Sequence, residues 1–271
     1  MVNFPPPYED LLPELQDCFE DDGVMPMIRH PLVYSVPHHF MMNAYMNKSL
    51  KAKQGLAETF KNEERWTAYI FLHERPYRLM ALTTLIGRKG FTLGSLKFLQ
   101  AVRDVWVDTE FPSQNALAWN SVFGHAIRAN FNPLGMRFTM TSGEQKWFDE
   151  APEILTIYRG FAQEENPHGE LTDDGMSWTV DYEKAKWFAR RFVKQNLNED
   201  GTLKASARHS KIEIPYVAHA TIPKKDIIAY IEERGESEVI IFSQFSINVQ
   251  GNHDNVKYRN DGFKLSQIEE V

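Results

Sequence analysis

The chain has 271 residues, of which 42% are hydrophobic and 25% are charged, with a net charge of -7. This composition excludes disordered and collagen-like proteins, and no apolar run approaches the ~20 residues of a membrane-spanning helix. The acidic balance argues against a protein that coats nucleic acid through its overall field, but it allows a local basic strip. Residues 1–8 lack a signal-peptide pattern and Cys18 has no disulfide partner, so we expect a cytoplasmic protein, with later injection into another cell left open.

Charge is unevenly placed along the chain. Residues 1–24 contain seven acidic side chains and no Lys or Arg. Residues 25–150 contain 15 Lys and Arg against 10 Asp and Glu, whereas residues 151–271 contain 15 against 20. We expect the acidic start to be a solvated arm; the alternative is that it covers a basic surface on this chain or on a partner.

The first half of the chain has apolar side chains at helical spacing. Four segments share this pattern: residues 57–73, 77–87, 93–107 and 114–129. Pro76 marks a boundary, and Ser113 is the expected N-cap of the last segment. Polar stretches near 132–135 and 142–144 are predicted to be loops. We therefore expect residues 1–150 to form a mainly helical domain.

The second half changes to the short apolar runs of β-strands. These runs are residues 154–158, 177–180, 216–222, 227–230, 238–242, 245–249 and 256–259. A helix is predicted over 182–195, and residues 251–255 are predicted to form a turn. The fold class is therefore α+β, with a strand-rich domain over residues 151–271.

Three short motifs lie beside these predicted strands. Tyr158-Arg159-Gly160 closes the first strand, Ser177-Trp178-Thr179 opens the second, and Gly235-Glu236-Ser237-Glu238 directly precedes an apolar strand. Each motif alone would occur often by chance, but the three together, in this order, are specific. In this combination residues 153–260 resemble mono-ADP-ribosyltransferases of the Arg–Ser–Glu type, in their bacterial and phage branch.

The resemblance implies a split β-sandwich and a reaction on NAD. The enzyme would cleave the nicotinamide–ribose bond and transfer ADP-ribose to a nitrogen of a macromolecule, either a protein arginine or a base amine of RNA or DNA. A phage, prophage or bacterial toxin of this kind usually has a neutralising antitoxin partner. Two alternatives stay open: an NAD glycohydrolase, in which water replaces the acceptor, and a catalytically silent phage structural or interaction protein.

The chemistry of the reaction suits these residue types. Nicotinamide leaves as a neutral molecule while positive charge develops on the ribose, so a fixed carboxylate is more useful than a general acid. The resemblance assigns that role to Glu238, braced by Ser177, and it assigns the pyrophosphate to Arg159, whose guanidinium suits phosphate oxygens.

The remaining motif residues complete the expected site. Glu236 lies two residues before Glu238, so in extended backbone both side chains leave on one side, and Glu236 is placed to act as general base toward the acceptor. Gly160, Trp178 and Thr179 are expected at the NAD site. Trp178, which is larger than the residues usual there, would pack on the sheet or against the nicotinamide ring, and Thr179 would support the strand end or the nicotinamide pocket. NAD is the expected substrate, and no metal-ligand spacing is found.

Each site residue also has a plain structural interpretation. Arg159 could belong to a surface ion pair, Ser177 could simply begin a strand, and the two glutamates could be solvated turn acids. The predicted helix 182–195 is ambiguous as well, because Trp187 lies among Lys184, Arg190, Arg191 and Lys194. We favour solvated charges with Trp187 packed on the helical half, over a surface for single-stranded nucleic acid. Lys204, Arg208, His209 and Lys211 extend this basic stretch.

Overall fold

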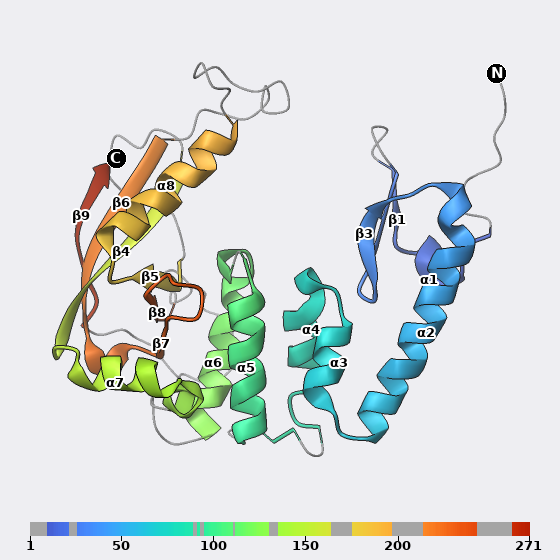
Figure 1. Ribbon diagram of the computed structural model, residues 1–271, viewed down its shortest axis with the longest axis horizontal. Coiled ribbons are helices and arrows are strands. Elements are labelled where there is room, and N and C mark those ends of the chain that lie inside the picture. Colours follow the sequence, from blue (N-terminus) through green and yellow to red (C-terminus); the bar gives the residue numbers. More distant parts are fainter. Residues whose placement is uncertain are drawn as a thin grey trace, which may run out of the picture. The chain divides into compact units, whose positions relative to one another are not determined.

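The computed structural model describes residues 10–21, 26–88, 91–92, 95–110, 112–129, 135–163, 175–196, 214–242 and 262–271. The chain forms two compact units, residues 1–109 and 110–271 (Figure 1). In the described part of the chain, no helix has the length and apolar character needed to cross a membrane. The predicted runs at 245–249 and 256–259, and the turn at 251–255, lie outside the described residues.

The first unit combines helices with a small antiparallel sheet in the order β1-β2-β3. Its elements are α1 (Pro13–Gln16), β1 (Phe19–Glu20), β2 (Met27–His30), β3 (Val33–Pro37), η1 (Phe40–Met42), α2 (Asn43–Asn62), α3 (Trp66–Leu72), η2 (Arg75–Tyr77), α4 (Arg78–Thr84) and α5 (Leu96–Asp108). Helices α4 and α5 follow predicted segments, but α2 begins well before the first of them, and the predicted segment 57–73 is divided between α2 and α3. The sheet was not expected from the sequence. Its strands are two to five residues long, which is too short for a period-2 pattern to be recognised.

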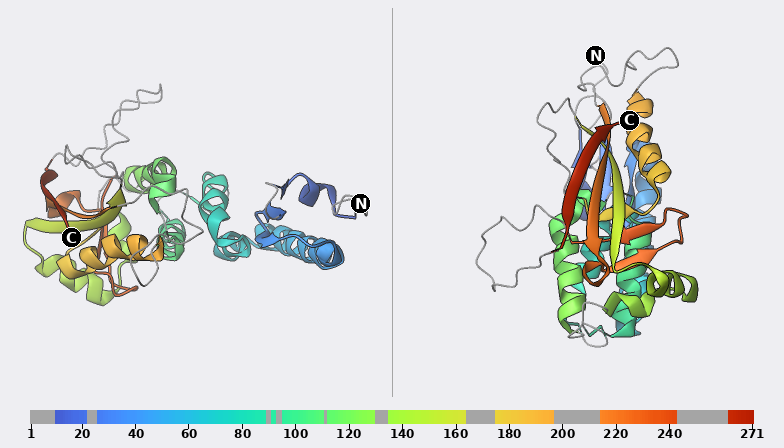
Figure 2. Two further views of the ribbon diagram at one scale, coloured as in Figure 1. Left: turned by 90° about the horizontal axis from the view of Figure 1, so that it is seen from above. Right: turned by 90° about the vertical axis from the view of Figure 1, so that its left-hand side faces the viewer.

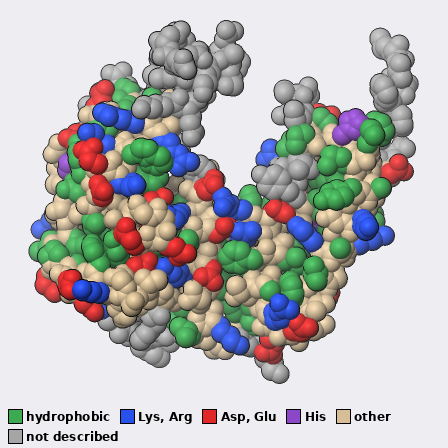
Figure 3. Space-filling model, viewed as in Figure 1, with side chains coloured by type: hydrophobic (Ala, Val, Ile, Leu, Met, Phe, Trp, Pro, Cys, Tyr) green, Lys and Arg blue, Asp and Glu red, His purple; other side chains and the backbone are tan. Residues whose placement is uncertain are grey.

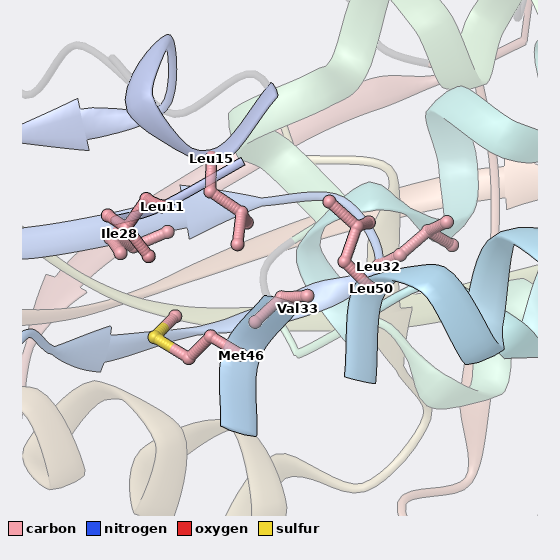
Figure 4. Packing of buried hydrophobic residues seen from close by; sticks show 7 residues of the cluster. All are labelled: Leu11, Leu15, Ile28, Leu32, Val33, Met46 and Leu50. Carbon is pink, nitrogen blue, oxygen red and sulfur yellow. The ribbon is translucent and has the colours of Figure 1, made fainter. Parts of the chain in front are cut away.

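The described part of the acidic start is not a solvated arm. Leu11, just before α1, and Leu15, within it, are 4% and 0% exposed. Both pack with Ile28, Met46 and Leu50 (Figure 4). Two hydrogen bonds also tie this segment to α2, because the Asn47 amide group donates to the Asp10 carbonyl and accepts from the Leu12 amide. Apolar side chains between the acids thus anchor the segment to the core of the first unit.

The second unit contains a six-stranded antiparallel sheet in the order β7-β8-β5-β4-β6-β9 (Figures 1 and 2). Its elements are η3 (Pro112–Asn115), α6 (Ala116–Ala129), η4 (Gly135–Thr139), α7 (Ser142–Glu150), β4 (Ile154–Gln163), β5 (Ser177–Thr179), α8 (Tyr182–Asn196), β6 (Ile214–Pro223), η6 (Lys224–Asp226), β7 (Ala229–Ile231), β8 (Glu238–Ile240) and β9 (Lys264–Glu270). Strands β4 and β6 pair over ten residues, from Ile154 opposite Pro223 to Gln163 opposite Ile214. The structure combines helices with antiparallel strands, which is compatible with the expected α+β class.

Helix α7 belongs with the sheet, although residues 142–144 were predicted to be loop. Thr141 and Glu144 form a capping box, in which each side chain accepts a hydrogen bond from the other residue's backbone amide. The second carboxyl oxygen of Glu144 accepts from the amide of Glu232, and Trp147 stacks on Tyr230 of β7 with ring centroids 3.6 Å apart. The boundary expected near residue 150 therefore marks the change from helix to strand inside the second unit, because these contacts join α7 to β7.

Helix α8 packs closely on one face of the sheet, beside β4 and β6 (Figure 2). Ala185 and Ala189 are fully buried against Val217, and Gly160 of β4 faces the helix backbone. A Cβ atom at Gly160 would lie 1.8 Å from the carbonyl oxygen of Ala185. Only glycine permits this close approach of the α8 backbone to β4. The contact fixes the position of α8, the helix that follows the Ser177-Trp178-Thr179 motif.

Another predicted feature differs in the structure. Ser113 lies inside η3 rather than capping a helix, because α6 begins three residues later at Ala116.

Candidate functional site

Glu238 is the central residue of a polar cluster at the sheet. It begins β8, where it pairs with Thr179 of β5 on one side and Ile231 of β7 on the other. Its exposed fraction is 1%, so its carboxylate is withdrawn from water. A carboxylate buried to this degree needs hydrogen-bond donors, and the structure supplies them from two directions.

The first donor is the hydroxyl of Ser177. This hydroxyl donates to Oε1 of Glu238, across the diagonal of the β5–β8 pair. The carbonyl oxygen of Ser177 accepts a hydrogen bond from Arg159 Nη1 at 2.5 Å. The three motifs are therefore physically linked, with Ser177 as the residue that connects the guanidinium to the carboxylate.

The guanidinium of Arg159 is held in position by a glycine. A Cβ atom at Gly175 would lie 1.9 Å from Nε of Arg159, so the side chain packs directly on the Gly175 backbone. Alternation along β4 turns Arg159 away from the face on which Gly160 meets α8, and the long side chain then reaches Ser177. A larger residue at 175 would displace the guanidinium.

The second donor to Glu238 is Arg234. Its Nη2 atom lies 2.9 Å from Oε2 of Glu238 and 3.0 Å from Oε2 of Glu236. One nitrogen therefore holds both carboxylates, and the side chains of Arg234 and Glu236 stay 26% and 23% exposed. The convergence of Glu236 and Glu238 that the sequence predicted is present.

The reason for this convergence differs from the prediction. Glu236 is not in extended backbone: it lies in a turn, where Gly235 and Ser237 have φ angles of 63° and 46°. These left-handed residues reverse the chain before β8 starts. The hydroxyl of Thr179 fixes the turn, since it donates to the Glu236 carbonyl at 2.7 Å and accepts from the Asp181 amide at 3.0 Å.

The two carboxylates have different environments. Burial raises the pKa of the Glu236 carboxyl above its usual value, and the nearby charge of Glu238 adds to this, while Arg234 acts in the opposite direction. Lys184 and Arg191 of α8 also lower this pKa. Glu236 is thus more basic than an ordinary glutamate, which suits a group that accepts a proton.

Two of the expected NAD-site residues lie outside the polar cluster. Gly160 packs against α8, as described above. Trp178 is 2% exposed: its Nε1–H donates to the Gly175 carbonyl, and its ring makes an edge contact with Phe263. Alternation along β5 separates Trp178 from Ser177 and Thr179, so its contacts in the structure are packing contacts.

The sequence analysis gave no role to Arg234, although the residue directly precedes Gly235-Glu236. The signal that would have identified it is a cationic residue just before two acidic residues whose side chains leave the backbone on the same side. Lys204, Arg208, His209 and Lys211 lie outside the described residues. Among the residues that the structure describes, no group of three or more His, Cys, Asp or Glu side chains is placed to hold a metal ion.

The arrangement can therefore perform a limited set of steps. A buried carboxylate can stabilise positive charge that develops beside it, a more basic carboxylate can accept a proton, and two guanidinium groups supply donors for anions. Compared with known proteins, the chain matches no family model, no curated protein and no solved structure.

Proposed function

We propose that the protein is a mono-ADP-ribosyltransferase that uses NAD as its substrate. The observation that carries the proposal is the hydrogen-bonded connection of Arg159, Ser177 and Glu238, three residues far apart in the sequence. The split β-sandwich belongs to this proposal as well; the described strands of the second unit form one antiparallel sheet in which β5 and β8, the strands of Ser177 and Glu238, are neighbours.

In the proposed reaction Glu238 acts on the ribose. The bond between the ribose carbon and the nicotinamide nitrogen breaks, and nicotinamide leaves with the electron pair as a neutral molecule. The negative charge of Glu238 stabilises the positive charge that develops on the ribose. Ser177 keeps Oε1 in place, so the other oxygen, Oε2, is the one that meets the sugar after Arg234 shifts away from it.

Arg159 and Glu236 have complementary roles in this proposal. The guanidinium of Arg159 attracts the pyrophosphate, which needs several directed donors. Glu236 accepts the proton that the attacking nitrogen loses as its bond to the ribose carbon forms, and its raised pKa favours this step. Each group acts from a position that the backbone fixes: strand β4 and the Gly175 backbone for Arg159, and the 235–237 turn for Glu236.

The test is the substitution Glu238→Gln, which keeps the shape and removes the charge. Purified protein is incubated with NAD labelled in the adenylate part and with cell lysate, and labelled macromolecules and released nicotinamide are measured. We expect a loss of at least about 100-fold, as for removal of one strong electrostatic contact to a transition state. Full activity in this variant would overturn the assignment.

The matched control is Glu153→Gln, an exposed glutamate of the same unit. It should leave label transfer unchanged. Release of nicotinamide by the unaltered protein without any labelled macromolecule would identify an NAD glycohydrolase instead. Failure of the unaltered protein to bind NAD in calorimetry would favour a catalytically silent protein.

A further inference from the structure

Helix α8 carries an exposed aromatic side chain between two cations. Trp187 is 53% exposed, more than any other Phe, Tyr or Trp side chain that the structure describes in the second unit. Lys184 and Arg191 lie one turn before and one turn after it, with their charged groups 5.9 Å and 5.3 Å from the ring centroid. Lys184, Trp187 and Arg191 therefore form one surface, called here the α8 stripe.

More than half of the surface of Trp187 is accessible in the structure, and its packing on the helical half stays a prediction. In the space-filling view, basic and hydrophobic side chains lie together over the part of the surface that α8 forms (Figure 3). The tryptophan is an exposed stacking surface with positive charge on both sides.

The two cations of the α8 stripe lie close enough to Glu236 for their charges to act on it. The charges of Lys184 and Arg191 both act on Glu236 and lower its pKa. The chain supports this placement, since Thr179 holds the Glu236 carbonyl and α8 begins three residues after Thr179. A molecule that lies on the stripe therefore reaches the proposed general base.

Arg234 adds an independent observation about the acceptor. Its guanidinium lies between Glu236 and Glu238, which is the position that the guanidinium of a protein arginine would need. A cationic acceptor would have to displace Arg234 from both carboxylates and approach through the positive field of Lys184 and Arg191. A neutral amine on a polyanionic chain does not compete with Arg234 for the carboxylate oxygens, and the positive field attracts the chain that carries it.

We propose that the acceptor is a base amine of a single-stranded nucleic acid that binds on the α8 stripe. This inference rests on the function proposed above and names its substrate class. An unpaired base stacks on Trp187, while neighbouring phosphates lie at Lys184 and Arg191. The exocyclic nitrogen forms a bond to the ribose carbon as nicotinamide leaves, and its proton passes to Glu236. A single strand is required because pairing and stacking hide the amine in a duplex.

Binding can be tested without catalysis. A short fluorescent single-stranded oligonucleotide, as RNA and as DNA, is titrated with the full chain in the absence of NAD, and anisotropy is measured. Trp187→Ala should weaken binding by roughly 5- to 150-fold, and Trp187→Phe should restore most of it because a stacking face remains. Lys184→Ala and Arg191→Ala should each lower the salt slope by about 0.7.

The control for the cations is Lys264→Ala, an exposed lysine on β9, at the opposite edge of the sheet from β7 and β8. It should change neither the affinity nor the salt slope. Melting temperatures of all variants show whether they are folded. Equal binding by the unaltered protein and Trp187→Ala, both folded, would overturn the proposal.

Label transfer from NAD then separates this inference from the proposed function. Radioactive product from lysate is digested with nuclease or with protease. Label that is lost under nuclease alone, and that falls in Trp187→Ala, supports the inference. Label that is lost under protease alone overturns it but leaves the transferase intact. A Trp187→Ala effect on the KM for NAD, with unchanged binding of the oligonucleotide, would assign the stripe to NAD and also overturn it. Absence of nicotinamide release in every reaction would reject the transferase itself.

Discussion

Removing the Ser177 hydroxyl tests the connection on which the site depends. Ser177→Ala leaves Oε1 of Glu238 without this donor, and Glu238 is only 1% exposed, so water cannot replace it easily. A hydrogen bond to a charged group is worth about 1.5–3 kcal/mol. We therefore expect unfolding free energy to fall by this amount, which corresponds to roughly 3–12 °C in melting temperature for a unit of this size.

The change should depend on the charge of Glu238. In a Glu238→Gln background the side chain at 238 is neutral, so the loss of the hydroxyl costs less. The assay is a double-mutant cycle of Ser177→Ala and Glu238→Gln, with unfolding free energies from denaturant titration. We expect an interaction energy of about 1 kcal/mol or more between these contacting residues.

Two outcomes would refute this reasoning. If the two substitutions were additive to within about 0.5 kcal/mol, the residues would not interact as the structure has them. If Ser177→Ala changed melting temperature by less than a degree while Glu238→Gln lowered it strongly, the hydroxyl would not be a partner of the carboxylate. Neither readout requires catalytic activity, so the geometry is tested separately from the proposed function.

Three further perturbations have defined outcomes. Gly160→Ala should destabilise the protein by at least about 1–3 kcal/mol, measured by denaturant titration, because the new methyl group meets the α8 backbone at 1.8 Å and backbone cannot move aside as a flexible side chain can. A cost below 0.5 kcal/mol would contradict the close approach. The hydrogen bond from Tyr182 is the main reason why the pKa of Glu269 is lowered. The stabilisation from this carboxylate is present above the ordinary carboxyl pKa and is lost as pH falls through the lowered value, so Glu269→Gln should flatten the acid limb of a melting temperature–pH curve. Parallel curves for the two proteins would be evidence against this assignment. Arg234→Met should move the acid limb of the rate–pH profile to higher pH, because Arg234 lowers the pKa of Glu236 and the base must be deprotonated; a shift to lower pH, or none, would argue against Glu236 as the base.

The regular elements of the second unit follow from local pattern. Strand β4 alternates, with Leu155, Ile157 and Phe161 buried, and α8 has a small-residue face that meets the sheet. These patterns predicted the start of β4 and both ends of α8 closely, whereas β4 continues to Gln163, beyond the predicted end at residue 158. By contrast, β9 was not predicted, because its burial pattern contains no alternating buried face: four exposed residues are followed by two half-buried ones. Its position comes from pairing with β6, which no local pattern encodes.

Capping and turn chemistry explain two of the remaining differences. Helix α7 has a Thr141–Glu144 capping box, a recognisable start signal that was hidden in a stretch of polar residues and a glycine. The Glu236–Glu238 convergence was predicted for a strand and is produced by a turn with left-handed Ser237. A non-glycine residue in that conformation cannot be read from sequence, since tertiary contacts, here the Thr179 hydrogen bond, hold it there.

The residues that meet in the candidate site could be named from the sequence, but the ion pairs between them could not. The order of the motifs indicated that Arg159, Ser177 and Glu238 meet. No sequence spacing predicts that one nitrogen of Arg234 lies between two carboxylates. Under the function we propose, this placement sets the acceptor chemistry. An arginine that neutralises both glutamates keeps a buried pair of like charges stable in the absence of an acceptor, and it must move before Glu238 can meet a sugar. Its Nη2 leaves a carboxylate more easily when an anion offers an alternative partner than when a second guanidinium competes for the same oxygens. In the reaction we propose, the same cation that stabilises the resting cluster discriminates against cationic acceptors and in favour of a polyanion, in agreement with the positive charges on α8.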